Sequence, residues 1–163
     1  MKFPTTFSLK QIADIISSEY VGQDDFPVFG MNEIHVVENG DIVFVDHPKY
    51  YDKALQSKAT IISDDPFRDF NKLTSFFQPF VPNSQTISVT AKIGKNTVIQ
   101  PNAFIGNNVV IGDNCLIHSN VSIYDNCIIG NNVTIHAGSV LGADAFYYKK
   151  RPEGFDKLIS GGR

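Results

Sequence analysis

Two histidines, His118 and His136, are candidates for chemistry in this chain. An imidazole exchanges a proton near neutral pH and binds transition metals. The pair could therefore act as a general base with a neighbour, or as two ligands of a zinc site that another subunit completes. Alternatively, each histidine only fills a corner position that Ser88, Gln100 and Tyr124 fill elsewhere. Since no third ligand is convincing, we expect no metal site.

A second group of polar and aromatic side chains surrounds His47. The chain there reads Phe44-Val45-Asp46-His47-Pro48-Lys49-Tyr50-Tyr51. Aromatic rings on both sides of polar groups can stack on a flat ring and hydrogen-bond its edge. The alternative is a set of ordinary core and surface aromatics. The sequence contains no nucleophile elbow, P-loop or dinucleotide fingerprint.

A strict six-residue repeat predicts the element that positions the two histidines. Every sixth residue is a large aliphatic, namely Ile87, Ile93, Ile99, Ile105, Ile111, Ile117, Ile123, Ile129, Ile135 and Leu141. Asparagine follows three positions later, seven times in succession, at Asn96, Asn102, Asn108, Asn114, Asn120, Asn126 and Asn132. A fixed period of six is typical of a hexapeptide solenoid, a parallel β-helix. An antiparallel barrel, the nearest alternative, predicts alternating strands of varying length.

Each repeat supplies a short strand and a turn, and three successive repeats close one coil. Coils stack at the strand spacing of roughly 4.8 Å. His118 and His136 are three repeats apart, so they should stack on one edge. The aliphatic residue and the small residue two positions before it should point inward. Asparagine tolerates left-handed backbone and suits the corners, which Gly94, Gly106, Gly112, Gly130 and Gly142 should also ease. We expect about three coils in residues 83–142.

Residues 1–82 lack this period and predict a small α/β domain. A capping box at Ser8–Gln11 begins one helix, and Pro66 at a first helical position begins another. Strands are expected at residues 28–31, 34–37, 42–45 and 59–63, and a short helix at 50–57. Residues 143–163 should form an extruded loop and the start of further coils.

The composition excludes several classes of function. A net charge of −3 gives no basic surface for nucleic acid. No apolar run is long enough to span a membrane, and the N-terminus does not resemble a signal peptide, so we expect a cytoplasmic protein. Cys115 and Cys127 fall at the small inward position on different faces of a coil, which favours packed thiols over a disulfide or a metal pair.

Motifs from both halves of the chain point to one family. The first half contains Phe7-Ser8-Leu9-Lys10-Gln11-Ile12-Ala13, Gly40-Asp41-Ile42-Val43-Phe44 and His47-Pro48-Lys49-Tyr50. The repeat contains Ile117-His118-Ser119-Asn120-Val121-Ser122-Ile123-Tyr124 and Ile135-His136-Ala137-Gly138-Ser139-Val140-Leu141-Gly142-Ala143-Asp144-Ala145-Phe146. In this order the motifs resemble those of the UDP-3-O-acylglucosamine N-acyltransferases of lipid A biosynthesis. The resemblance covers essentially the whole chain.

The resemblance implies a uridine-binding α/β domain, a left-handed parallel β-helix, and a homotrimer with substrates in clefts between subunits. It implies transfer of a 3-hydroxyacyl group from acyl carrier protein to the 2-amino group of a UDP-linked 3-O-acylglucosamine, with no further cofactor. By matching positions, Phe44 and Tyr50 would flank the uracil. His47 stands where the family usually has asparagine, and its imidazole could make the same edge contact.

The family's general-base histidine lies in later coils, after the loop where this chain ends, so no catalytic role passes to His118 or His136. We therefore expect a fragment that lacks the catalytic residue. Two alternatives stay open. One is a nucleotide-sugar-binding trimer without catalysis. The other is a zinc-binding hexapeptide protein resembling the γ-class carbonic anhydrases.

Overall fold

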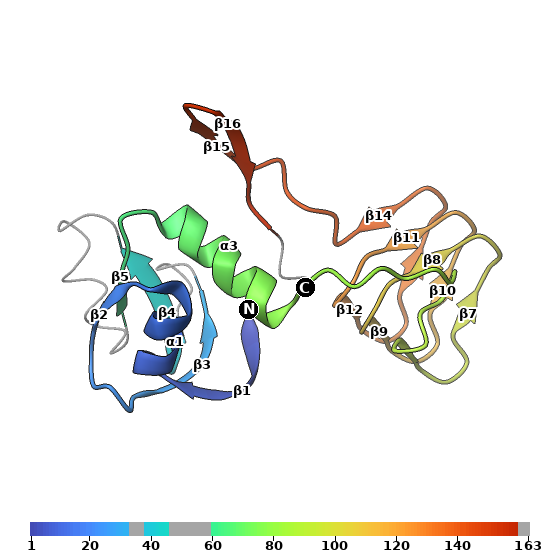
Figure 1. Ribbon diagram of the computed structural model, residues 1–163. Coiled ribbons are helices and arrows are strands. Elements are labelled where there is room, and N and C mark those ends of the chain that lie inside the picture. Colours follow the sequence, from blue (N-terminus) through green and yellow to red (C-terminus); the bar gives the residue numbers. More distant parts are fainter. Residues whose placement is uncertain (33–37, 46–59, 160–163) are drawn as a thin grey trace. The chain divides into compact units, whose positions relative to one another are not determined.

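The computed structural model describes residues 1–32, 38–45 and 60–159. They fall into two compact units, each described by itself below (Figure 1). The N-terminal unit comprises Met1–Pro79 together with Lys149–Gly154, and the β-helical unit begins at Phe80. The strand expected at 34–37 and the helix expected at 50–57 lie outside the described residues.

The first helix, α1 (Leu9–Ile16), begins at the predicted capping box. The Ser8 hydroxyl accepts a hydrogen bond from the backbone N–H of Gln11 at 3.1 Å, and the Gln11 side chain accepts one from the Ser8 backbone N–H at 2.8 Å. The helix ends at Ser17, whose backbone is left-handed with φ 58°. The apolar residues at helical spacing form its buried face, namely Leu9, Ile12, Ala13 and Ile16.

The second described helix, α3 (Pro66–Phe77), also begins as predicted. Pro66 occupies the first turn, and the Asp65 side chain accepts a hydrogen bond from the backbone N–H of Arg68 at 3.3 Å. Leu73 is fully buried on the inner face of this helix. Residues of α1, α3 and the strands share one apolar core, made chiefly of Leu9, Ile12, Ile16, Val28, Met31, Ile42, Ile61 and Leu73.

In the described part of the N-terminal unit, five strands form one sheet in the order β1-β3-β4-β5-β2. They are β1 (Lys2–Ser8), β2 (Glu19–Val21), β3 (Pro27–Met31), β4 (Asp41–Val45) and β5 (Thr60–Ile62). The three central strands run parallel, and β1 and β2 pair antiparallel at the edges. The sequence predicts the three apolar central strands. It misses β1 and β2, because edge strands are mostly exposed and carry little apolar alternation.

The six-residue repeat folds as predicted, into three parallel sheets of three short strands each within the described residues. The strands are β6 (Lys92–Ile93), β7 (Val98–Ile99), β8 (Phe104–Ile105), β9 (Val110–Ile111), β10 (Leu116–Ile117), β11 (Ser122–Ile123), β12 (Ile128–Ile129), β13 (Thr134–Ile135) and β14 (Val140–Leu141). Each strand pairs with the strand three repeats away; Leu116, for example, pairs with Val98 and with Thr134. The three expected coils of a parallel β-helix are therefore confirmed.

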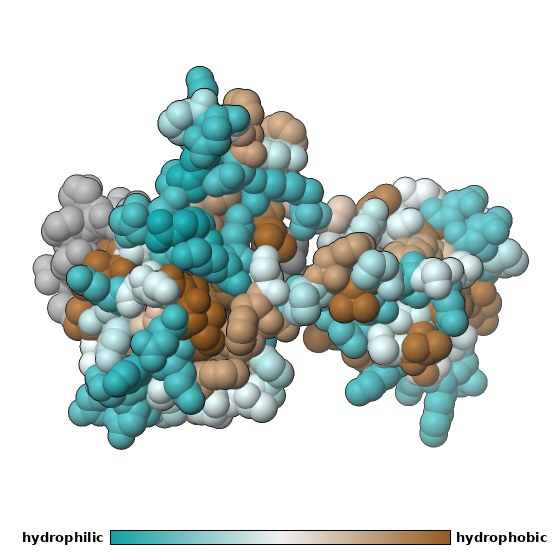
Figure 2. Space-filling view, in the orientation of Figure 1, coloured by the Kyte–Doolittle hydropathy of each residue, from teal (hydrophilic) through white to brown (hydrophobic). Residues whose placement is uncertain are grey.

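The interior of the β-helix is lined by the residues that the repeat predicts. The buried set consists of Ala103, Ile105, Val109, Ile111, Cys115, Ile117, Val121, Ile123, Cys127 and Ile135. Ile87 and Ile93 are each 40% exposed, because the first coil has a neighbour on one side only. Cys115 and Cys127 are both buried, as expected, and neither is in a disulfide. Outward-facing residues of the strands are mixed in polarity, and apolar residues are visible among hydrophilic ones on the surface (Figure 2).

Asparagine and glycine occupy the corners of the coils for different physical reasons. The sequence predicts the reason for asparagine but not the reason for every glycine. All seven repeated asparagines have left-handed backbone, with φ between 56° and 64°, which confirms the prediction. Gly94 and Gly112 have no positive φ. A Cβ on Gly94 would instead overlap the backbone of Gly112, and one on Gly112 would overlap the Asn131 side chain. Glycine is thus required there for close approach between coils rather than for a left-handed turn.

The segment after the last coil, which the sequence predicts to be an extruded loop, contains a hairpin of β15 (Tyr148–Arg151) and β16 (Gly154–Lys157). Residues Lys149–Gly154 group with the N-terminal unit. None of the helices in the described ranges is long and apolar enough to cross a membrane.

Candidate functional site

The carboxyl ends of three parallel strands meet at one edge of the N-terminal sheet. Asn32 follows β3, Phe44 is the penultimate residue of β4, and Ser63 follows β5. In open α/β sheets, ligands bind outside the carboxyl ends of parallel strands. This edge is therefore the first candidate for a binding site in the N-terminal unit.

Phe44, the one predicted uracil-binding residue that the structure describes, lies at this edge. Its ring is partly exposed and packs against the apolar core. It makes an edge-on contact with Phe70 of α3, with ring centroids 6.3 Å apart. Part of the ring thus stabilises the packing of the helix on the sheet, and part is open to solvent. His47 and Tyr50 lie outside the described residues.

A buried carboxylate, Asp69, fixes α3 beside the same edge. Its side chain is fully buried and accepts hydrogen bonds from the hydroxyls of Ser63 at 2.7 Å and Ser18 at 2.8 Å. The Nε of Arg68 donates to it at 2.8 Å, and Lys72 Nζ lies 3.4 Å away. Burial opposes ionisation, but the hydrogen bonds from Arg68, Ser63 and Ser18 outweigh it and hold the pKa of the Asp69 carboxyl below its usual range. The Ser63 contact ties the helix to the carboxyl end of β5.

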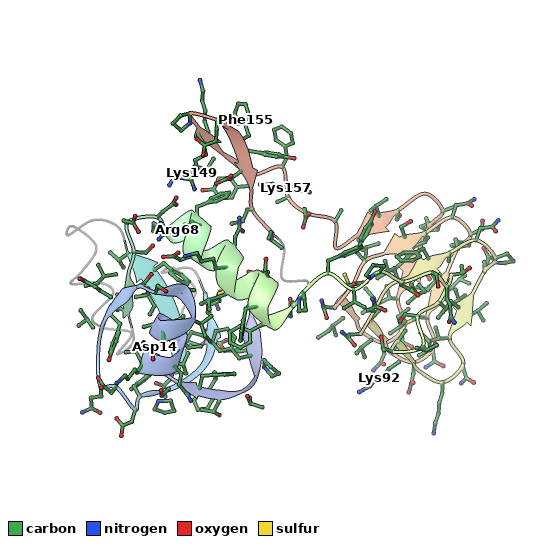
Figure 3. The ribbon with its side chains drawn as sticks, viewed as in Figure 1. Asp14, Arg68, Lys92, Lys149, Phe155 and Lys157 are labelled. Carbon is green, nitrogen blue, oxygen red and sulfur yellow. The ribbon has the colours of Figure 1, made fainter. Side chains whose placement is uncertain are left out.

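Asp65 carries a second cluster of charges, at the start of α3. Lys149 Nζ lies 2.9 Å from its carboxylate, and the Arg151 guanidinium also pairs with it. Figure 3 shows Lys149 near the end of α3 that carries Arg68. Burial opposes ionisation of Asp65, but the hydrogen bonds from Arg151 and Lys149 outweigh it and hold its pKa well below the usual range. Sequence reasoning missed this contact, because 84 residues separate Asp65 from Lys149.

The histidine pair occupies one corner of the β-helix, as its spacing of three repeats predicts. The rings of His118 and His136 are stacked, with centroids 5.1 Å apart and planes 11° apart. Gln100 stands one coil earlier at the same position, and its Oε1 lies 3.1 Å from Nδ1 of His118. The same oxygen accepts a hydrogen bond from the Ser119 backbone N–H at 3.0 Å. The sequence predicts the stack, whereas the role of Gln100 emerges only from the structure.

A comparison with known protein families agrees with the parallel β-helix described above. The bacterial transferase hexapeptide (six repeats) family model matches residues 90–123 and again residues 108–143. The starting points of the two matches are offset by one coil of the β-helix. Residues 90–143 therefore match the repeats of that family model. The match supports a transferase of the acyl- or acetyltransferase superfamily, and it agrees with the hexapeptide solenoid that the sequence predicts.

The hexapeptide repeats and the N-terminal unit offer different chemistry. The N-terminal edge offers the partly exposed ring of Phe44 and the side-chain amide of Asn32, which suit recognition of a flat polar ring. The hexapeptide repeats offer imidazoles, which can accept a proton or bind a metal. Within the described ranges, no group of three or more His, Cys, Asp or Glu side chains is arranged to hold a metal ion.

Proposed function

We propose that this chain takes part in the transfer of a 3-hydroxyacyl group from acyl carrier protein to the 2-amino group of a UDP-3-O-acylglucosamine, a step of lipid A biosynthesis. The single observation that carries the proposal is the joining of transferase hexapeptide repeats to a preceding helix-and-sheet unit. Repeats alone would support any hexapeptide acyltransferase. The N-terminal unit and its motifs favour a nucleotide-sugar substrate.

The uracil of the substrate would bind at the carboxyl edge of the N-terminal sheet. Phe44 supplies a partly exposed aromatic face there. His47 and Tyr50 follow β4 in the sequence by two and five residues, respectively. Phe44 and Tyr50 would flank the base, and His47 would donate to or accept from its polar edge.

In this proposal the N-terminal residues Phe44, His47 and Tyr50 bind and orient the sugar nucleotide. A histidine would take the proton of the sugar amine as the amine attacks the thioester carbonyl, and backbone N–H groups would stabilise the oxyanion. The C–S bond of the thioester would then break, and the thiol of acyl carrier protein would leave with the proton that the histidine returns. We do not assign that histidine to His118 or His136, because neither lies in the family motif for the base. The partners would be acyl carrier protein and two further copies of the chain.

Titration of the full 163-residue chain with UDP tests the binding site. Phe44→Ala and Tyr50→Ala should each weaken UDP binding by about 5- to 150-fold, because stacking on one base contributes about 1–3 kcal/mol. Phe70→Ala is the matched control, since it removes the ring that contacts Phe44 but leaves Phe44 in place. It should alter stability more than UDP affinity.

Two results would overturn the assignment. Unchanged UDP affinity in Phe44→Ala and Tyr50→Ala would show that these rings do not contact the base. The absence of any UDP binding by the unaltered chain would remove the nucleotide-sugar proposal itself. Phe44→Leu, which keeps much of the apolar volume against Phe70, separates loss of stacking from loss of core packing.

A further inference from the structure

We propose that His118 and His136 of a single chain form a binding site for a divalent transition-metal ion such as Zn²⁺, Ni²⁺ or Cu²⁺, with Gln100 positioning the first imidazole. The site is distinct from the sugar-nucleotide site and does not depend on acyl transfer. It needs no residue from another subunit.

The β-helix fixes the backbone beneath the pair. Gln100, His118 and His136 directly follow β7, β10 and β13, which are neighbours in one sheet. The Gln100 N–H donates to Ile117 O at 2.9 Å, and the His118 N–H donates to Ile135 O at 3.0 Å. The side chains of Gln100, His118 and His136 therefore project from the same corner of successive coils. Hydrogen bonds between the coils fix the backbone at this corner.

Hydrogen bonding selects the tautomer of His118. A backbone N–H can only donate, so the Ser119 N–H identifies the Gln100 atom that faces it as the carbonyl oxygen. That oxygen can only accept, so Nδ1 of His118 must carry the proton in the bond at 3.1 Å. In the neutral ring the lone pair then lies on Nε2. A protein histidine that binds a metal is usually oriented by this kind of bond from its other ring nitrogen.

His136 provides the second imidazole. Its ring lies parallel to that of His118 at a centroid distance of 5.1 Å, and the residue is exposed. Two nitrogens that bind one ion at roughly 2.0–2.1 Å must lie within about 4.2 Å of each other. The proposal therefore requires the exposed His136 ring to rotate about its side-chain bonds until one of its nitrogens comes within that distance of Nε2 of His118.

The surroundings of the pair suit a metal ion bound by nitrogen. The corner segments 100–103, 117–121 and 134–139 contain no charged residue. No lysine or arginine of these segments repels a cation there, and no carboxylate of theirs competes with the imidazoles. Imidazole favours zinc, copper and nickel over magnesium and calcium. Because the described residues place no third His, Cys, Asp or Glu beside the pair, water would complete the coordination.

Calorimetric titration of the tag-free full chain with Zn²⁺ alone and with Ni²⁺ alone tests the proposal. The expected result is one ion per chain, with affinity reduced at least about tenfold by either His118→Asn or His136→Asn. The chain has four histidines, and the other two, His35 and His47, give matched controls. His35→Asn and His47→Asn should leave the affinity unchanged.

Substitutions of Gln100 test whether its hydrogen bond to His118 contributes to metal affinity. Gln100→Leu should weaken binding about tenfold, because the acceptor that fixes the His118 tautomer is lost. Gln100→Glu should retain or strengthen binding, since a carboxylate oxygen accepts the same proton. Cu²⁺ bound to the unaltered chain should show two nitrogen ligands by electron paramagnetic resonance, and one in His136→Asn.

Three results would overturn the proposal. They are unchanged affinity in both His118→Asn and His136→Asn, one ion per two or three chains, and a Cu²⁺ spectrum without histidine nitrogen. Circular dichroism of each variant shows whether the β-helix is retained, and a histidine variant that unfolds is replaced by the glutamine substitution at the same position. UDP affinity is measured on the same samples. It should not change in the His118, His136 and Gln100 variants, so failure of this proposal and failure of the sugar-nucleotide proposal are distinguishable.

Discussion

The two units of this protein satisfy their polar groups in different ways. In the β-helical unit, side chains repeatedly accept from a backbone N–H one coil away: Asp113 from Lys95 at 2.7 Å, and Asp125 from Asn107 at 2.7 Å. In the N-terminal unit the partners are irregular and distant in sequence. Asp69 binds a serine 51 residues away.

This difference indicates how each unit should respond to substitution. A repeat reproduces the same local contact in every coil, so one lost contact affects one corner. In the N-terminal unit, one buried carboxylate serves several donors at once. Its removal should leave several polar groups unpaired, and such groups are costly when buried.

The largest effect is expected in the apolar stack of the β-helix. Ile117→Ala should reduce the free energy of unfolding by about 4 kcal/mol, because the side chain is fully buried between two coils. Ile93→Ala, in the first coil, is the control. Ile93 is 40% exposed, so the loss should be about 1 kcal/mol. Urea denaturation measures both, and equal losses would contradict the stacked interior.

Asp69→Asn should have the next largest effect and should reduce the free energy of unfolding by about 3 kcal/mol. The substitution keeps the size of the side chain but removes the buried charge that pairs with Arg68. Asp64→Asn is a matched control, since Asp64 pairs with the same Arg68 at 2.7 Å but is exposed. Its effect should be barely measurable. A large loss of unfolding free energy in Asp64→Asn would contradict this, because it would mean that the exposed Arg68–Asp64 pair stabilises the fold.

Acid should affect the N-terminal unit through its carboxylates. The pKa values of Asp41, Asp65 and Asp69 are held below their usual range in the folded state. Such groups stabilise the fold above their unfolded pKa of about 4, and the stabilisation is lost as pH falls through the lower folded value. Hydrogen exchange, corrected for intrinsic rates, should show protection in β4 and α3 falling below about pH 4. Constant protection down to about pH 2 would contradict this.

The smallest effect concerns a single corner. Asn108 has φ 56°, so Asn108→Ala should reduce the free energy of unfolding by about 1 kcal/mol, through left-handed strain. Asn108→Gly should be nearer to neutral, because glycine adopts this conformation freely. The Asn108 amide also donates to Asn126 at 3.2 Å. If alanine and glycine cost the same, this side-chain contact rather than backbone conformation explains the asparagine repeat.

The sequence predicts the β-helix almost completely, because the same inward positions recur with every repeat. It also predicts α1 and α3 from their capping residues. It misses β1 and β2, which are exposed edge strands, and the hairpin β15–β16. The contact between Asp65 and Lys149 has no local pattern, since it depends on how distant segments fold together.

The candidate sites were predictable to different degrees. Spacing alone predicts the stack of His118 on His136, because every third repeat returns to the same face of the coil. The orientation of His118 by Gln100 is not predictable, since it depends on which atom of an amide faces a backbone N–H. For Gly94 and Gly112, the pattern predicts the positions but suggests the wrong cause, whereas Gly142 has the positive φ that a corner glycine suggests. A close approach between coils leaves the same sequence signal as a left-handed turn.

The central claim is that the N-terminal unit binds a sugar nucleotide at the carboxyl edge of its sheet. Titration of the isotope-labelled chain with UDP, followed by amide and aromatic NMR signals, tests it most directly. The account predicts shifts at Asn32, Phe44 and Ser63, and none at the inward residues of the hexapeptide repeats. No shift at millimolar UDP, or shifts confined to the repeats, would contradict it.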